Sequence, residues 1–365
     1  MKPRAIGIIM AGGLGERFWP VTSEANPKYA LRFNHSKTLI GDTYERLRLI
    51  YPANAIYVIT VKEHAALIRK LLPQLPAAQI LAEPLRRNTA GAGTYAGFEL
   101  KRRFGADTVV SFFPADAMIK DRKRFAADIK LAIQTARQTN RLVVLGITPT
   151  FPATGYGYVE MGTALSSDLS GVYQVRCFTE KPPLAQAKRF LQSKRFLWNA
   201  GIFTWRLADF EAELKKHAPD YWKSFYEVYA GTGSRGSNAT AVKKLFERLP
   251  VAPIDKLLME KTKNGAVVRS VFDWDDIGAW DALGRIEPDA KGNTLMAYGV
   301  IENVHNSIIS VPSHIKVAVA GLKDVVVVHH GDHLLVCHRG HCQEVSRLRR
   351  QVLATPPADK KKARR

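Results

Sequence analysis

The sequence has few cysteines and no long hydrophobic run. Only three cysteines occur among 365 residues, and so small and odd a number excludes a disulfide framework and is typical of a reducing compartment. No apolar run approaches the ~20 residues that a membrane-spanning helix needs. The run at residues 6–10 is too short for the hydrophobic region of a signal peptide, because Gly12 and Gly13 interrupt it at once. We therefore expect a soluble, cytoplasmic protein with no membrane partner.

Acidic residues are scarce relative to basic ones. The chain has 33 Asp and Glu against 54 Lys and Arg, a net charge of +21, which raises the alternative of a nucleic-acid-binding protein without catalysis. However, the basic residues are spread over many segments, and no zinc-ligand pair or aromatic RNA-binding pattern accompanies them. Nucleic acid is therefore not the partner that we expect. The one concentrated basic run, residues 359–365, is typical of a disordered tail.

A strand-like run at residues 6–10 leads into a glycine-rich loop. Glycines let backbone N–H groups approach phosphate oxygens, and fixed cations balance the charge of a polyphosphate. A Walker A loop would need Lys-Ser/Thr at its end, and a dinucleotide fingerprint would need a small residue in place of Phe18, so both are excluded. The loop favours a nucleoside triphosphate, and a plain glycine-rich turn stays the alternative. The candidate loop residues are Ala11, Gly12, Gly13 and Gly15, and the candidate cations are Arg17 and Lys28.

Helix-like and strand-like segments alternate as far as Ile147. Apolar strands alternating with helices predict an α/β fold with a parallel sheet that is covered on both faces, and its ligands should bind beyond the carboxyl ends of the strands. The length suggests about two domains at ~150 residues each. The predicted strands are 6–10, 55–60, 79–82, 108–113 and 142–147, and the predicted helices are 38–51, 64–72, 89–104 and 124–138.

Acidic side chains follow two of these strands. Glu83 could accept hydrogen bonds from N1–H and N2–H₂ of guanine, although the same segment also reads as a turn with Asn88 or Thr89 as a helix cap. Asp116 follows the strand 108–113 and is a candidate Mg²⁺ ligand, because Mg²⁺ prefers hard oxygen ligands. Three acids at 273, 275 and 276 cannot all point the same way on an extended segment. Asp276 is our candidate for the second metal ligand.

Beyond Pro149, polar residues recur beside glycines. Gly157 could offer backbone hydrogen bonds to sugar hydroxyls, Glu180 and Asn199 could read hydroxyls, and Lys181 could hold a sugar phosphate. The alternative is a plain core with a solvated Glu-Lys pair.

From about residue 293 the pattern is β-like without helices, and residues 325–330 and 333–338 resemble a hairpin with a two-residue turn. Its histidines and cysteines raise the alternative of a zinc site. The Cys-x₄-Cys spacing lacks a second pair, so we do not predict a structural metal.

Eight motifs now stand in one order along residues 6–285. They are AGGLGERFWP with Pro27-Lys28, EPLRRNTA, FPAD, GYGYVE, FTEKP, FLWNAGIF, IDKLLMEK and DWDDIGAW. This series resembles the mannose-1-phosphate guanylyltransferases (GDP-mannose pyrophosphorylases), which are sugar-1-phosphate nucleotidyltransferases.

The resemblance implies a Rossmann-like, mostly parallel catalytic domain at 1–285, a small β-rich domain at 286–350 and a basic tail at 351–365. It also implies transfer of GMP from GTP to mannose 1-phosphate with Mg²⁺. Arg17 and Lys28 would then grip the triphosphate, and Asp116 and Asp276 would hold the metal. The residues near guanine would be Glu83, Asn88 and Thr89, and those near the sugar phosphate would be Gly157, Glu180, Lys181 and Asn199.

Four residues depart from the family pattern. Ala117 replaces a usual His, Gly91 a usual Pro, and Pro253 and Lys256 a usual Ser and Tyr. These departures leave open a different nucleoside triphosphate or hexose 1-phosphate in the same reaction class. The sequence does not fix the oligomeric state and leaves a homodimer open.

Overall fold

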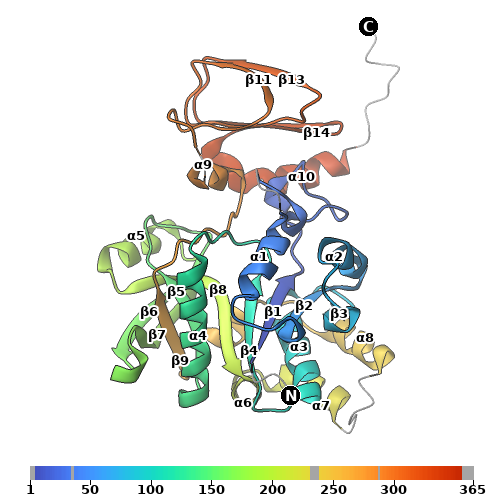
Figure 1. Ribbon diagram of the computed structural model, residues 1–365, viewed down its shortest axis with the longest axis vertical. Helices are drawn as coiled ribbons and strands as arrows, with labels where there is room; N and C mark the ends of the chain where they lie inside the picture. The colour runs from blue at the N-terminus through green and yellow to red at the C-terminus, as the bar shows by residue number, and fades with distance from the viewer. Residues whose placement is uncertain (1–4, 34–36, 231–237, 287, 356–365) are drawn as a thin grey trace. The chain divides into compact units, whose positions relative to one another are not determined.

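The structure of the protein is a computed structural model that describes residues 5–33, 37–230, 238–286 and 288–355 (Figure 1). The chain forms two compact units. Unit 1 comprises Met1–Gly12 and Leu39–Trp274, and unit 2 comprises Gly13–Thr38 and Asp275–Arg365. The glycine-rich loop thus groups with the C-terminal third of the chain. Within the described ranges, no helix is both long and apolar enough to cross a membrane.

Unit 1 is built on a nine-stranded sheet with the order β3-β2-β1-β4-β8-β5-β9-β7-β6. Its first half confirms the predicted parallel arrangement, because β1 pairs in parallel with β2 and β4, and β2 pairs in parallel with β3. The strands are β1 (Ala5–Ala11), β2 (Ile56–Val61), β3 (Ile80–Glu83), β4 (Val109–Pro114), β5 (Leu142–Ile147), β6 (Gly157–Ala164), β7 (Val172–Glu180), β8 (Phe196–Arg206) and β9 (Gly265–Ser270).

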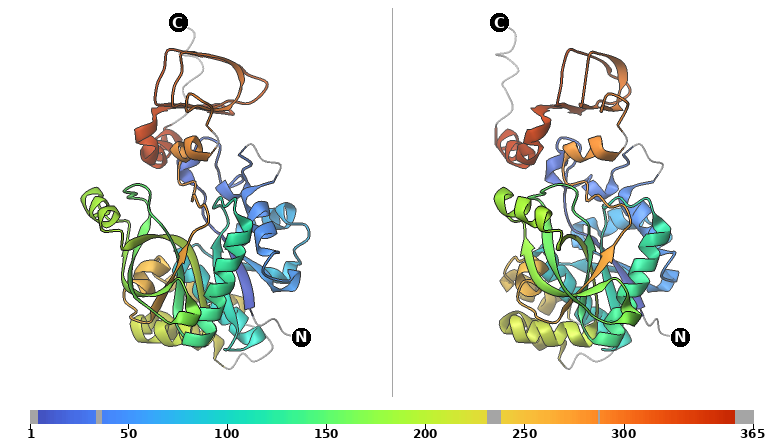
Figure 2. Two further views of the ribbon diagram at one scale, coloured as in Figure 1. Left: turned by 60° about the vertical axis from the view of Figure 1, so that its left-hand side comes forward. Right: turned by 90° about the vertical axis from the view of Figure 1, so that its left-hand side faces the viewer.

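The second half of the sheet corrects the prediction of a mostly parallel sheet. β8 pairs antiparallel with β4, β5 and β6, and β7 pairs antiparallel with β6 and β9. Because β8 pairs with both β5 and β6, the strands β8, β5, β9, β7 and β6 close into a ring (Figure 2). The sheet is therefore mixed. The βα alternation stops after β5, and antiparallel strands need no crossover helix between them.

Helices cover both faces of this sheet, as predicted (Figures 1 and 2). The core between them is apolar and aromatic, with Phe112, Trp205 and Phe210 almost fully buried. The helices of unit 1 are α1 (Leu39–Leu47), α2 (Ala65–Leu71), α3 (Asn88–Phe104), α4 (Arg122–Thr139), α5 (Leu184–Ser193), α6 (Leu207–His217), α7 (Pro219–Tyr229) and α8 (Ala239–Arg248), followed by a π-helical turn, η8 (Asp255–Met259).

Unit 2 combines short helical turns with two small sheets. The sheets have the orders β10-β12-β14-β15 and β11-β13. The hairpin is confirmed, because β14 and β15 pair antiparallel up to His330 opposite His333. The elements are η1 (Glu16–Phe18), η2 (Lys28–Ala30), η9 (Trp280–Ala282), α9 (Leu283–Ile286), β10 (Thr294–Met296), β11 (Tyr298–Glu302), β12 (Ile308–Ser310), β13 (Lys316–Ala320), β14 (Val325–His330), β15 (His333–His338), η10 (Arg339–Glu344) and α10 (Val345–Ala354).

The helix α10 corrects the prediction of a helix-free C-terminal segment. It also continues through residues 351–354, which the sequence analysis assigns to the basic tail. Val345, Leu348 and Val352 recur at the helical spacing i, i+3 and i+7 with arginines between them, so the sequence does carry an amphipathic helical pattern here. Residues 356–365 of the predicted tail lie outside the described residues.

Candidate active site

The glycine-rich loop of unit 2 folds Lys28 back onto Gly15. The backbone N–H of Lys28 donates to Leu14 O over 3.1 Å. Gly15 has a left-handed φ of 71°, and a Cβ at this position would overlap Lys28 Cβ, so only glycine fits. The Lys28 side chain is almost fully buried, and its Nζ donates to Asp276 O over 2.5 Å. The loop therefore fixes one predicted phosphate cation beside a predicted metal ligand.

Arg17 joins the same group in unit 2. A Cβ added to Gly278 would lie 3.1 Å from Asp276 Oδ2 and 3.6 Å from Arg17 Nη1. Arg17 Nη1 also donates to Gln343 Oε1 over 2.5 Å. The structure thus brings together three of the four predicted catalytic residues, Arg17, Lys28 and Asp276.

The C-terminal segment supports this loop from far along the chain. Gln343 in η10 accepts the hydrogen bond from Arg17, and Arg349 in α10 forms an ion pair with Glu16 over 3.1 Å. Neither Gln343 nor Arg349 was predicted from the sequence. No local signal could have revealed them, because they lie more than 300 residues from their partners.

The three acids near residue 275 have separate surroundings. Asp273 belongs to unit 1, where its carboxylate accepts hydrogen bonds from the backbone N–H groups of Lys120 and Asp121. Asp275 belongs to unit 2 and forms an ion pair with Arg285 over 2.8 Å. Asp276 lies beside the glycine-rich loop, where its backbone carbonyl accepts the hydrogen bond from Lys28 Nζ.

Asp116 lies in unit 1 on a loop that is fixed on both sides. Ala115 N donates to Met10 O over 3.2 Å, and Arg46 donates from Nη2 to Ala117 O over 2.9 Å. The guanidinium of Arg46 is buried, which lowers its pKa to about 10, and it is paired with Asp42 over 2.6 Å. The loop thus holds Asp116 just beyond β4.

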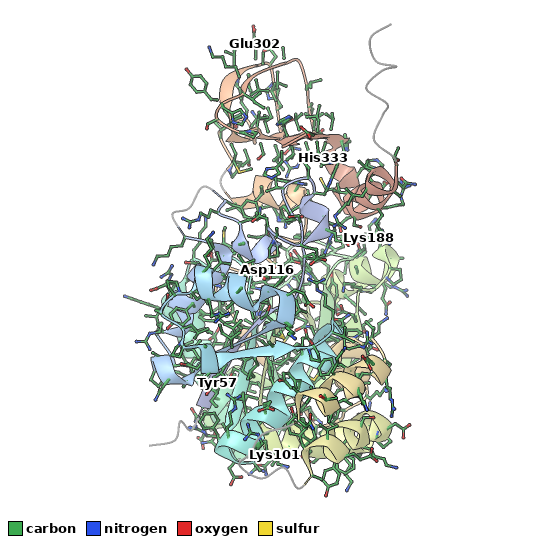
Figure 3. All side chains as sticks on the ribbon, turned by 90° about the vertical axis from the view of Figure 1, so that its right-hand side faces the viewer. Tyr57, Lys101, Asp116, Lys188, Glu302 and His333 are labelled. Carbon is green, nitrogen blue, oxygen red and sulfur yellow. The ribbon has the colours of Figure 1, made fainter. Side chains whose placement is uncertain are left out.

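Figure 3 labels Asp116 at the end of the sheet where the parallel strands finish, far from Lys101 at the other end of unit 1. Unit 1 therefore presents Asp116 at the edge where ligands of such sheets bind.

Glu83 is a buried carboxyl at the end of β3. Its Oε1 would lie 3.7 Å from a Cβ on Gly12, and its Oε2 has no hydrogen-bond partner among the described residues. Burial raises the pKa of Glu83 to about 8, although the positive charge of Arg86 acts to lower it. A buried carboxyl without a partner is costly. A ligand that donates two hydrogen bonds would satisfy Glu83 and favour its ionised form.

Asn88 and Thr89 begin α3 rather than standing apart from it. Asn88 has a left-handed φ of 61°, and its Oδ1 accepts from Thr89 N over 2.7 Å. Thr89 Oγ1 accepts from Ile254 N over 2.9 Å. The N-cap of α3 is Arg87, which makes no side-chain cap bond, so neither Asn88 nor Thr89 caps the helix as the alternative supposed. Their nucleotide-binding role stays a proposal.

The four predicted sugar-phosphate residues gather in unit 1, and we call them the sugar group: Gly157, Glu180, Lys181 and Asn199. Gly157 and Glu180 face each other in the β6–β7 pairing. A Cβ on Gly157 would lie 2.6 Å from Glu180 Oε2 and 3.2 Å from Asn199 Cβ, so a larger residue there would require the Glu180 carboxylate to shift. Lys181 Nζ forms an ion pair with Glu180 Oε1 over 2.7 Å. The group combines hydroxyl-reading oxygens with a cation.

Asn199 lies where β8 changes partners. One side of β8 pairs with β6 through residues 196–198 and with β4 through residues 203–206. Gly201, with a left-handed φ of 68°, lies between these segments. Asn199 Nδ2 donates to Asp255 Oδ1 over 2.9 Å. Asp255 is a residue to which the sequence analysis gives no role. Its place in the motif IDKLLMEK is a signal, but its burial is visible only in the fold.

The two predicted metal ligands belong to different units. Within the described ranges, no group of three or more His, Cys, Asp or Glu side chains is placed to hold a metal ion. Asp116 belongs to unit 1 and Asp276 to unit 2.

Residues 6–292 match the family model described as "Nucleotidyl transferase". The chain belongs to this nucleotidyltransferase family. Members of the family generally use a divalent metal ion. Membership fits the fold, because the match includes β1 through β9 and the loop residues Arg17 and Lys28.

The chain is also similar to relatives whose names state a specific activity. A mannose-1-phosphate guanylyltransferase of Sinorhizobium fredii is 35% identical over 97% of this chain and 69% of its own length. A mannose-1-phosphate guanylyltransferase of Escherichia coli is 34% identical over 95% of this chain and 75% of its own length.

A solved structure extends the likeness to the fold. The crystal structure of a mannose-1-phosphate geranyltransferase from Thermus thermophilus superposes with a TM-score of 0.84 at 28% identity, covering 96% of this nucleotidyltransferase and all of that chain.

Proposed function

We propose that this protein transfers GMP from GTP to mannose 1-phosphate, giving GDP-mannose and pyrophosphate. The observation that carries the substrate assignment is the match to relatives of that name over almost the whole chain. The gathered sugar group and the buried carboxyl of Glu83 support it, because they offer the hydrogen-bonding groups that a hexose phosphate and a guanine require.

The reaction needs alignment and charge neutralisation. A phosphate oxygen of mannose 1-phosphate attacks the α-phosphorus of GTP in line, a new P–O bond forms, and the bond from that phosphorus to the pyrophosphate oxygen breaks. Arg17 and Lys28 neutralise the departing pyrophosphate. No strong base is needed, because the attacking phosphate is already ionised near neutral pH.

The remaining roles follow the chemistry of each group. Ala11, Gly12, Gly13 and Gly15 present backbone N–H groups to the nucleotide. Glu83, with Asn88 and Thr89 nearby in the chain, reads guanine. Gly157, Glu180 and Asn199 contact the sugar, and Lys181 holds its phosphate. We assign these roles to a catalytic domain at 1–285, which is followed by a small β-rich domain at 286–350.

We propose Mg²⁺ as the divalent ion, with Asp116 and Asp276 as its protein ligands. Two carboxylates fit the hard oxygen chemistry of Mg²⁺, which commonly takes one or two carboxylates together with substrate phosphates. When bound, the ion would neutralise phosphate charge. We keep the cytoplasm as the expected location.

A substrate panel tests the proposal. The full-length protein is incubated with Mg²⁺, each of the four ribonucleoside triphosphates and several hexose 1-phosphates, and pyrophosphate release is measured. We expect GTP with mannose 1-phosphate to exceed every other pair at least tenfold in kcat/KM. A higher value for another pair, or no turnover with any pair, would overturn the assignment. Light scattering on the same preparation gives the oligomeric state, which the sequence leaves open to a homodimer.

One observation favours a second candidate, the same reaction with a different nucleotide. A Cβ on Gly91 would lie 2.5 Å from Arg87 Cβ and 3.6 Å from the Tyr221 hydroxyl. The usual Pro at this position would therefore not fit without a shift of Arg87, so the segment near Glu83 differs from the family pattern. The same panel separates the two candidates by their preferred triphosphate.

A further inference from the structure

The turn η8 carries a buried carboxyl into the sugar group. Its π-helical bond runs from Glu260 N to Asp255 O over 2.9 Å, and an α-helical bond from Leu257 N to Pro253 O over 3.0 Å precedes it. Asp255 at the start of η8 is only 8% exposed. Such a carboxyl is stable only with hydrogen-bond partners, and its partner is Asn199.

Both ends of the Asn199 amide are held. Asn199 Nδ2 donates to Asp255 Oδ1, and Asn199 Oδ1 accepts from Gly201 N, each over 2.9 Å. These two bonds fix the rotation of the amide. An amide nitrogen carries two N–H groups, and among the described residues only Asp255 takes one of them. The second N–H is therefore left for a ligand hydroxyl.

Burial and the neighbouring Glu180 favour the protonated form of the Asp255 carboxyl. Burial first, and then the charge of Glu180, raise the pKa of Asp255 to about 7, and Lys181 opposes them. On α6, which also packs against η8, Glu213 and His217 pair with each other over 3.2 Å. A neutral Asp255 would not repel a sugar phosphate.

The residues just before Asp255 also hold the start of α3. Ile254 N donates to Thr89 Oγ1 over 2.9 Å, and Ala90 N donates to Ala252 O over 3.1 Å. The segment 252–255 therefore links the helix start beside the predicted base-reading residues to the sugar group.

We propose that Asp255 is a positioning residue of the sugar-phosphate site, acting through the amide of Asn199. The proposal rests on the proposed function and deepens it: Asp255 sets the direction of the N–H that reads a hexose hydroxyl, so it determines sugar affinity and sugar preference rather than nucleotide affinity.

A double-mutant cycle tests the proposal in the full-length enzyme. The variants are Asp255→Ala, Asn199→Ala and the double variant, with Asp128→Ala as the control, because Asp128 is a partly buried carboxyl on α4 outside the sugar group. We expect Asp255→Ala to raise KM for mannose 1-phosphate about tenfold, the effect of one lost hydrogen bond to a polar group, and to leave KM for GTP within about twofold. The double variant should be no worse than Asn199→Ala. Asp128→Ala should leave both KM values unchanged.

Three outcomes would overturn the proposal. They are an unchanged KM for mannose 1-phosphate in Asp255→Ala, equal increases in both KM values, and effects of the single variants that multiply in the double variant.

Asp255→Asn keeps the test decisive if Asp255→Ala does not fold. Its side-chain oxygen can accept the same N–H, so we expect KM for mannose 1-phosphate within about threefold of wild type at pH 7. Between pH 6 and 8.5 the wild-type KM should rise relative to that of Asp255→Asn, because ionised Asp255 adds a second negative charge beside Glu180. Parallel profiles would overturn the proposal. If the wild type does not turn over mannose 1-phosphate, the proposed function fails separately, and calorimetric binding of the panel sugar phosphates to the same variants tests Asp255.

Discussion

The sugar group of unit 1 and the glycine-rich loop of unit 2 are held in place by different parts of the chain. The sugar group stands on paired strands, and its contacts join β6, β7, β8 and η8. The loop residues Arg17 and Glu16 are held by Gln343 and Arg349, which lie beyond the family match at residue 292. The proposed sugar-binding residues thus stand on the sheet, whereas the proposed phosphate-binding Arg17 is held by the C-terminal segment. Variants that separate the two substrates test this contrast.

The largest expected effect is that of Asp116→Ala. Loss of a metal ligand should lower kcat about 1,000-fold, because a metal contributes several kcal/mol of charge stabilisation and ~1.4 kcal/mol corresponds to a tenfold change in rate. Pyrophosphate release at saturating substrates measures it, with the exposed Asp168→Ala as the control. Wild-type turnover in Asp116→Ala would make the metal assignment wrong.

Lys28→Ala should come next, with a loss of about 100-fold in kcat, the usual effect of removing one charged donor from a transition state. Binding of mannose 1-phosphate alone, measured by calorimetry, should stay within about twofold, because the sugar group belongs to unit 1. Equal loss of turnover and sugar binding would instead indicate a folding defect of the buried Lys28 site.

Gly157→Ala tests whether the sugar group affects mannose 1-phosphate and not GTP. The added methyl group would lie 2.6 Å from Glu180 Oε2, so Glu180 must move and KM for mannose 1-phosphate should rise about tenfold. KM for GTP should not change. Gly155→Ala is the matched control, because a Cβ there meets nothing within 4 Å. If both variants raise KM equally, the effect comes from the loop and not from Glu180.

The pKa of Glu83 predicts a pH dependence on the nucleotide side. Burial raises this pKa to about 8, and only the ionised carboxylate accepts both guanine N–H groups. The ionised fraction grows as the pH rises, so KM for GTP should fall several-fold between pH 7 and 8.5. Steady-state kinetics across this range measure it. In Glu83→Gln the slope should disappear, and a persistent slope would exclude Glu83 as its source.

The smallest expected effect is that of Arg349→Ala. A partly exposed ion pair is worth ~1 kcal/mol or less, so KM for GTP should rise about twofold to threefold while KM for mannose 1-phosphate stays constant. Arg347→Ala is the control, because Arg347 pairs with Glu344 rather than with the loop. Identical kinetics of the two variants would argue against support of the loop by α10.

The first half of the fold could be predicted because its signals are local. Apolar runs gave β1 to β5 within a few residues, and the strand-end rule placed Glu83 and Asp116 correctly beside β3 and β4. The ring could not be predicted, because pairing between strands far apart leaves no mark in either strand's own pattern.

The candidate site also has a part that local sequence signals predict and a part that depends on distant contacts. Gly157, Glu180 and Asn199 lie in three of the motifs that carry the family resemblance, and the structure brings these residues together. Asp255 and Gln343 were missed because their importance lies in burial and in partners 56 and 326 residues away. A single sequence shows residue types but not such distant contacts.

The closed ring in unit 1 has a consequence for how specificity can diverge. Gly157, Glu180 and Asn199 all belong to ring strands, whereas the glycine-rich loop, Glu83 and Asp116 follow strands of the open parallel half. Because β8 joins the two halves of the sheet through its pairing with β4, Asn199 stands on a strand that both halves share. Under the proposed roles, substitutions on β6 and β7 therefore leave the strands that lead to Glu83 and Asp116 unchanged, whereas substitutions on β8 affect both halves of the sheet.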